Sequence, residues 1–147
     1  MMAGVLAILG VAAWLRFADL SHQPLHFDEA ATGARSTADR LELGRYVFNP
    51  QHGHGPLLSM GAAVVARLRG ETSWNELTKF SLRLSVALCS LLTVAGALLI
   101  GRRTTGLAAA ALVATSPLLV YYGRIFIHES VFVAFGLLTL LSLTAFL

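Results

Sequence analysis

Two adjacent carboxylates, Asp28 and Glu29, follow the first long apolar segment, within the sequence Pro-Leu-His-Phe-Asp-Glu-Ala-Ala of residues 24–31. Charged side chains beside a hydrophobic segment need a physical reason in a chain this apolar. A carboxylate in such a place can take a proton from an acceptor hydroxyl during group transfer. The structural alternative is that Asp28 caps a helix and Glu29 favours the positive end of the helix dipole.

A second charged stretch, Tyr-Tyr-Gly-Arg-Ile-Phe-Ile-His-Glu-Ser, covers residues 121–130 between two apolar segments. It contains a cation, an imidazole and a carboxylate, which are Arg124, His128 and Glu129. Arg124 and His128 would share one face of a helix, whereas Glu129 would point elsewhere unless the stretch is a loop. The structural alternative here is an interfacial Arg–Glu pair with a belt of tyrosines.

Two acidic positions with basic groups at a membrane surface suit the transfer of a group from a lipid-linked phosphate. In that chemistry Asp28 is the predicted base, and Glu29 and Glu129 position the acceptor or bind a metal. Arg124 faces the negative charge that develops on the phosphate. Arg83 lies near the outer end of a later apolar segment, as a further phosphate contact or a snorkelling anchor, and the anchor is favoured.

The histidines all fall in the polar stretches between apolar segments. With the acidic residues they supply the nitrogen and oxygen ligands that a divalent cation such as Mg, Mn or Zn uses. The alternative is ordinary polar loop residues, with His54 supporting the turn before Pro56. The histidines are His22, His26, His52, His54 and His128, and the candidate metal ligands are His26, Asp28, His128 and Glu129.

The composition indicates a membrane protein, because 56% of the residues are hydrophobic and 13% are charged, against about 45–50% and 25% in soluble proteins. The net charge of +3 comes from scattered residues, so no nucleic-acid partner is expected. Cys89 is the single cysteine, which excludes a disulfide within the chain and a site built from several thiolates.

These residues need helices to position them, and the hydropathy pattern predicts an all-α polytopic membrane protein in a lipid bilayer. Trp14 and Phe17 are the predicted interfacial anchors of the first span. A signal peptide is the alternative there, but no basic region precedes the apolar run. We expect about four transmembrane helices, near residues 2–18, 82–100, 106–122 and 131–147, and an external loop near 19–79 with surface helices near 28–43 and 56–69.

The apolar segment Leu57–Leu68 decides the topology, because about twelve residues are too few to span a bilayer. If it does not cross, both acidic positions lie on the extracytoplasmic face, and Arg102 and Arg103 lie in the cytoplasm as the positive-inside rule prefers. If it crosses, the acidic positions face opposite compartments. The first topology is favoured. The last run, 131–147, ends while still apolar, so we expect an N-terminal part of a longer protein whose C-terminal part is a partner.

Five motifs in this order resemble the N-terminal part of the GT-C glycosyltransferases, in the protein O-mannosyltransferase and aminoarabinose-transferase-like group. The resemblance is nearest to a prokaryotic subfamily described as flippase-activity-associated. The motifs are His-x-Asp-Glu at His26–Glu29, His-Gly-Pro-Leu at His54–Leu57, Arg-Leu-Ser at Arg83–Ser85, and Ser-Pro with Tyr-Tyr-Gly-Arg and a downstream acid at Ser116–Glu129.

The resemblance implies an inverting membrane transferase that uses a polyprenyl-phosphate sugar, with the catalytic aspartate in the first external loop. That role falls on Asp28, and Glu129 matches the acidic position after the third span of the family. His54 belongs to His-Gly-Pro, which replaces the more common His-Pro-Pro or Tyr-Pro-Pro, and joins Arg83 and Arg124 as a substrate-binding candidate. The family's later loops, which help to bind the lipid phosphate, are absent from these residues, so this part alone is expected to be inactive.

Three functions are consistent with the pattern. The favoured one is a sugar transferase of a prokaryotic plasma membrane with its active site on the extracytoplasmic face. The second is a lipid-carrier transporter or flippase accessory, in which the same charges bind a polyprenyl-phosphate headgroup without turnover. The third is a structural membrane subunit whose loop charges are anchors.

Overall fold

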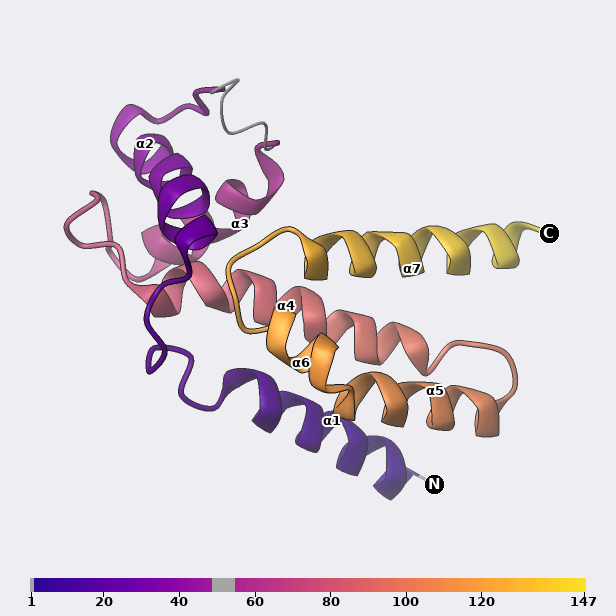
Figure 1. The fold of residues 1–147 in the computed structure, drawn as a ribbon. Coiled ribbons are helices and arrows are strands. Elements are labelled where there is room, and N and C mark those ends of the chain that lie inside the picture. The colour runs from indigo at the N-terminus through magenta and orange to yellow at the C-terminus, as the bar shows by residue number, and fades with distance from the viewer. Residues whose placement is uncertain (1, 49–54) are drawn as a thin grey trace. The chain divides into compact units, whose positions relative to one another are not determined.

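The computed structural model describes residues 2–48 and 55–147, and the regular structure of that part is helical, without a strand. The all-α class is therefore confirmed (Figure 1). The chain falls into two compact units: unit 1 comprises Met1–Ala18, Ala87–Arg124 and His128–Leu147, and unit 2 comprises Asp19–Val86 and Ile125–Ile127. The elements are α1 (Met2–Phe17), the π-helix η1 (Glu29–Ala34), α2 (Arg35–Leu43), α3 (Leu57–Leu68), α4 (Lys79–Ala97), α5 (Arg103–Thr115), α6 (Pro117–Tyr122) and α7 (Glu129–Phe146).

Small side chains bring the helices of unit 1 close together. α1 packs along α5 (Figure 1). A Cβ added to Gly106 would lie 2.4 Å from the carbonyl oxygen of Leu98, so the backbones approach too closely there for any side chain. Helices in membranes associate through such small-residue contacts. The buried core of this unit consists of Ala12, Val94, Ala97, Ala110 and Ala114.

Two helices, α4 and α7, are long and apolar enough to cross a membrane, whereas the apolar helices α1 and α3 have 16 and 12 residues. α7 leaves large apolar side chains uncovered within the chain, and Phe132 and Phe146 are 72% and 88% exposed. An apolar surface of this kind is typical of a membrane-spanning helix that faces lipid. The crossing of the bilayer by α1, and by α5 with α6, stays a prediction.

The segment 106–122, expected as one continuous helix, is divided into α5 and α6 at Ser116. The cause is Pro117, which has no N–H to donate and disfavours the helical conformation of the residue before it. Ser116 accordingly has φ −58° and ψ 118°. Its hydroxyl accepts a hydrogen bond from the backbone N–H of Leu119 at 3.5 Å, which caps α6.

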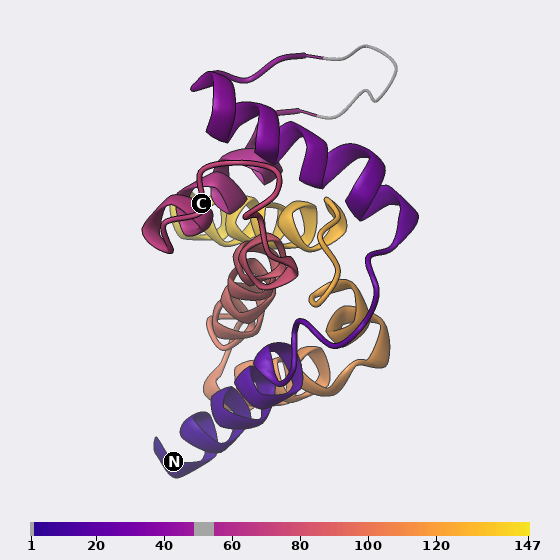
Figure 2. The same ribbon diagram turned by 90° about the vertical axis from the view of Figure 1, so that its left-hand side faces the viewer.

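Unit 2 is built on α2, which packs with η1 against α3 (Figure 2). Gly44 ends α2 in the left-handed conformation with φ +68°, as the sequence predicts. The expected surface helix 28–43 begins with η1, a rare helix type that often marks a functional site. Gly33 is required in η1, because a Cβ there would lie 2.5 Å from Cε1 of the buried Phe126 ring.

Candidate active site

Glu29 is the buried member of the acidic pair and caps the start of its helix. The helix begins after His26, whose backbone N–H donates to Oε2 of Glu29 at 2.7 Å. This contact is the carboxylate half of a capping box. Nδ1 of His26 in turn lies 3.3 Å from the backbone nitrogen of Asp28 and accepts its N–H. The expected capping role of Asp28 is therefore wrong, since His26 and Glu29 cap the helix.

Arg83 is the main partner of Glu29. Its Nε lies 2.8 Å from Oε1 and its Nη2 lies 2.7 Å from Oε2, which is the bidentate geometry of a strong ion pair. The remaining N–H groups donate to carbonyl oxygens of the turn before His26. These acceptors are Leu20 at 2.8 Å, Gln23 at 3.1 Å and Pro24 at 2.9 Å. All five donors of the guanidinium are thereby used.

The Glu29 carboxylate is equally saturated. Oε1 also accepts the backbone N–H of Phe126 at 2.7 Å, so four N–H groups donate to its two oxygens. Burial alone raises the pKa of Glu29, but the hydrogen bonds from Arg83, Phe126 and His26 together with the charge of Arg83 outweigh it and hold the pKa below its ordinary value. Glu29 is therefore an ionised, buried anchor.

This geometry leaves the expected ligand-binding roles of Glu29 and Arg83 as predictions. The Arg83 side chain is 3% exposed and that of Glu29 is fully buried. The Arg83 guanidinium is enclosed by the chain and all its donors are used within it. The four N–H groups that donate to Glu29 occupy the lone-pair directions of its carboxylate.

Asp28 is the accessible carboxylate of the pair. Its side chain is 62% exposed, and Oδ2 lies 3.6 Å from Nδ1 of His26, itself 53% exposed. Asp28 and His26 are two side chains of the types that bind metals, whereas protein metal sites commonly use three or more such ligands. No group of three or more His, Cys, Asp or Glu side chains suited to a metal occurs in residues 2–48 and 55–147. The metal ligands stay a prediction.

Most of the second charged stretch belongs to unit 1, whereas Ile125–Ile127 belong to unit 2. The stretch is not helical between Gly123 and His128, so Arg124 and His128 do not share a helix face. Arg124 donates to the carbonyl oxygens of Leu15 at 2.7 Å and Ala18 at 2.6 Å, at the end of α1. Glu129 is exposed in the first turn of α7, where the positive end of the helix dipole stabilises a carboxylate. The expected proximity of Glu129 to Asp28 stays a prediction. His52 and His54 lie outside the described residues.

Arg16, which the sequence reasoning did not single out, has extensive side-chain contacts in unit 1. It is fully buried, and its guanidinium donates to Oγ of Ser90 at 2.8 Å. It also donates to the carbonyl oxygens of Val113 and Ala114, both at 3.0 Å, at the end of α5. The available signals were an arginine inside an apolar segment and the later proline that leaves carbonyls unpaired.

Glu71 is a second buried acid that the sequence reasoning did not single out, in unit 2. It accepts hydrogen bonds at 2.8 Å from the hydroxyls of Thr78 and Ser81, and at 3.1 Å from Nε of Arg69. Burial raises its pKa, but the bonds from Ser81, Thr78 and Arg69 outweigh burial and lower it overall. Glu71 thus fixes the loop between α3 and α4.

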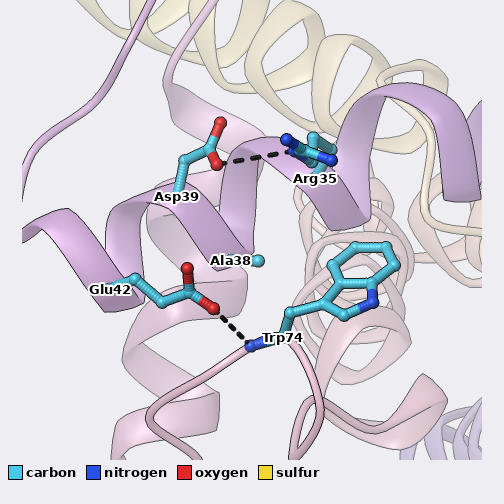
Figure 3. Close-up of a pocket in the computed structure, with 5 residues that line it drawn as sticks. All are labelled: Arg35, Ala38, Asp39, Glu42 and Trp74. Atoms are coloured by element: carbon cyan, nitrogen blue, oxygen red, sulfur yellow. Dashed lines mark hydrogen bonds and ion pairs between the residues drawn. The ribbon is translucent and has the colours of Figure 1, made fainter.

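An open hollow of about 200 Å³ lies between α2 and this loop (Figure 3). Glu42 accepts the backbone N–H of Trp74 at 2.8 Å, and the Arg35–Asp39 pair at 3.6 Å lies on the same side of α2. None of the predicted site residues lines it. The lining residues are Arg35, Ala38, Asp39, Glu42 and Trp74.

These observations define an all-helical membrane protein that holds an exposed aspartate beside a buried Glu–Arg pair. Residues 53–147 match the dolichyl-phosphate-mannose-protein mannosyltransferase family, and the chain belongs to that family. It is therefore a membrane glycosyltransferase, and a polyprenyl-phosphate sugar donor fits the family. Arg83, Arg124 and Glu129 fall inside the matched residues, whereas Asp28 precedes them. No curated protein and no solved structure matches the chain.

Proposed function

We propose that the protein transfers a sugar from a polyprenyl phosphate to an acceptor hydroxyl with inversion at the sugar, and that Asp28 is the general base. The observation that carries this proposal is the difference in burial between the two adjacent acidic residues. Glu29 is buried and saturated, whereas Asp28 next to it is 62% exposed. A base must reach the proton that it abstracts, and an exposed carboxylate on a fixed turn can do so.

The proposed reaction is a single displacement. Asp28 takes the proton of the acceptor hydroxyl, and the acceptor oxygen forms a bond to the anomeric carbon. The bond from that carbon to the phosphate oxygen breaks on the opposite face, and the polyprenyl phosphate leaves with the electron pair. Arg124 is the candidate for stabilising the departing phosphate, although two of its donor contacts already go to carbonyls at the end of α1.

Asp28→Asn tests the base, because it keeps the shape of the side chain and removes its basicity. In the full-length protein we expect sugar transfer from a polyprenyl-phosphate-mannose donor to fall about 10²–10⁴-fold, the usual contribution of a general base. Asp39→Asn is the matched control, since Asp39 is an aspartate on the surface of the same unit and is expected to leave transfer unchanged. Unchanged transfer by Asp28→Asn would refute the base assignment.

The same measurement separates the transferase from a non-catalytic headgroup-binding protein. Release of polyprenyl phosphate from the labelled donor reports turnover, and retention of the labelled donor on purified protein reports binding. Binding without release in the wild type, lost in Asp28→Asn, would favour the lipid-carrier or flippase-associated function. Release that depends on Asp28 supports the transferase.

We also propose that Asp28 faces the extracytoplasmic side of the membrane. Arg35→Cys and Arg103→Cys, each in a Cys89→Ser background, place single thiols at exposed positions in unit 2 and at the start of α5. A membrane-impermeant maleimide added outside cells should label the Arg35→Cys variant at once and the Arg103→Cys variant only after permeabilisation. The reverse pattern would invert the proposed orientation.

A further inference from the structure

We propose that Glu29 and Arg83 act as one positioning pair, which fixes the backbone that carries Asp28 without touching the substrate. This inference rests on the proposed role of Asp28 as the base. The two residues are 54 positions apart in the sequence, and their bidentate contact has N–O distances of 2.8 Å and 2.7 Å. Both side chains are enclosed, so they can act on the reaction only through the backbone that they hold.

The first argument is that the pair fixes the turn on both sides of Asp28. Glu29, directly after Asp28, holds the backbone N–H of His26 two residues before it. Arg83 holds three carbonyls of the preceding turn, those of Leu20, Gln23 and Pro24. Asp28 therefore lies between two anchored segments, and its own carboxylate takes no part in the anchoring.

The second argument is that one carboxylate joins three separate segments of unit 2. It binds the start of the helix at His26, the first part of α4 through Arg83, and the segment 125–127 through the N–H of Phe126. The Phe126 ring also lies against Gly33 of η1, where no side chain fits. A displacement of about 1 Å can cost roughly 10²-fold in rate, so such a junction is a strong determinant of where Asp28 points.

The third argument is electrostatic. As an ion pair Glu29 and Arg83 are together neutral, so they hold Asp28 without adding net charge beside it. Loss of one member would leave the other's charge buried without a partner, so both members are needed to hold the turn. The other titratable groups of this turn are His26, the exposed Asp19–His22 pair at 3.4 Å and Lys79, which donates to the Gln23 carbonyl.

The test is the turnover of Glu29→Gln in the full-length protein at one fixed pH, followed as release of polyprenyl phosphate. The amide has one oxygen for four N–H donors, so we expect kcat to fall about 10–100-fold with the donor KM within about twofold. In Glu29→Gln/Arg83→Met no buried charge is left without a partner, but the anchors of the turn are still missing, so kcat should stay low with the same donor KM.

Asp39→Asn again serves as the control and should change neither kcat nor the donor KM. A wild-type kcat in folded Glu29→Gln would overturn the positioning pair, and the base assignment would stand if Asp28→Asn were inactive in the same assay. Activity in Asp28→Asn would overturn the proposed function itself. If Glu29→Gln does not fold, Arg83→Lys decides, because it keeps the charge and loses the bidentate contact. It should lower kcat without changing the donor KM, and a wild-type kcat would overturn the proposal.

Discussion

Replacement of Arg83 by methionine is expected to lower the free energy of unfolding by about 3–5 kcal/mol at pH 7, the cost of removing one partner of a buried ion pair. Methionine fills part of the space but donates no hydrogen bond. Glu29 then keeps two backbone donors and loses its charge partner, and three carbonyls of the turn at 20–24 lose their N–H donors. Unfolding in detergent micelles, followed by circular dichroism, measures the change.

The pH dependence of this loss has a definite sign. In the wild type the pKa of Glu29 is lowered by folding, so its contribution to stability is present above its ordinary value near 4.5 and is lost as the pH falls through the lower folded value. Without Arg83, burial favours the protonated, neutral form of Glu29. Protonation of Glu29 at lower pH therefore stabilises the folded variant. The difference in stability between the wild type and Arg83→Met should therefore shrink as the pH falls from 7 to 4.

Arg35→Met is the matched control, because the exposed Arg35 pairs with the half-buried Asp39 one helical turn away. Exposed pairs of this kind contribute about 0.3–0.5 kcal/mol, so the control should unfold close to the wild type at every pH. Equal stabilities of Arg83→Met and Arg35→Met would contradict the energetic importance of the buried pair. A difference that grows on acidification would contradict the ionised state of Glu29.

The helices were largely predictable from the sequence because their signals are local. Gly44 marks the end of α2, and α3 occupies Leu57–Leu68, the apolar segment recognised in the sequence. The division at Ser116 was also encoded locally, by Pro117. It was missed because the apolar composition of 106–122 continues across the proline, and hydropathy does not register a missing N–H.

The chemistry of the site was predictable only in part. The sequence marked Asp28 and Glu29 as a functional pair, but it could not say which of the two is buried. The burial of Glu29 depends on its contact with Arg83, 54 residues later in the chain. Hydrophobic periodicity carries no information on such long-range contacts. Arg16 was overlooked for the same reason, since its carbonyl acceptors Val113 and Ala114 lie about a hundred residues away.

Arg16→Met should have the second large effect on stability. Pro117 cannot donate to the Val113 carbonyl as a helix would require, and Arg16 supplies that donor as well as one for Ala114. Each buried carbonyl left without a donor costs about 1–3 kcal/mol. Removing the guanidinium also removes the cost of burying a cation, so we expect a loss at the lower end of about 2–6 kcal/mol. Arg103→Met, at an exposed position, is the control.

The cause of this loss can be isolated by returning the missing donor to the backbone. Pro117→Ala restores an N–H four residues after Val113, so α5 can continue towards α6 without the guanidinium. Arg16→Met/Pro117→Ala should therefore be more stable than Arg16→Met in the same detergent unfolding assay, whereas Pro117→Ala alone should gain less because Arg16 already holds both carbonyls. Additive effects would mean that Arg16 stabilises unit 1 through packing and its bond to Ser90, and not by substituting for the proline's missing donor.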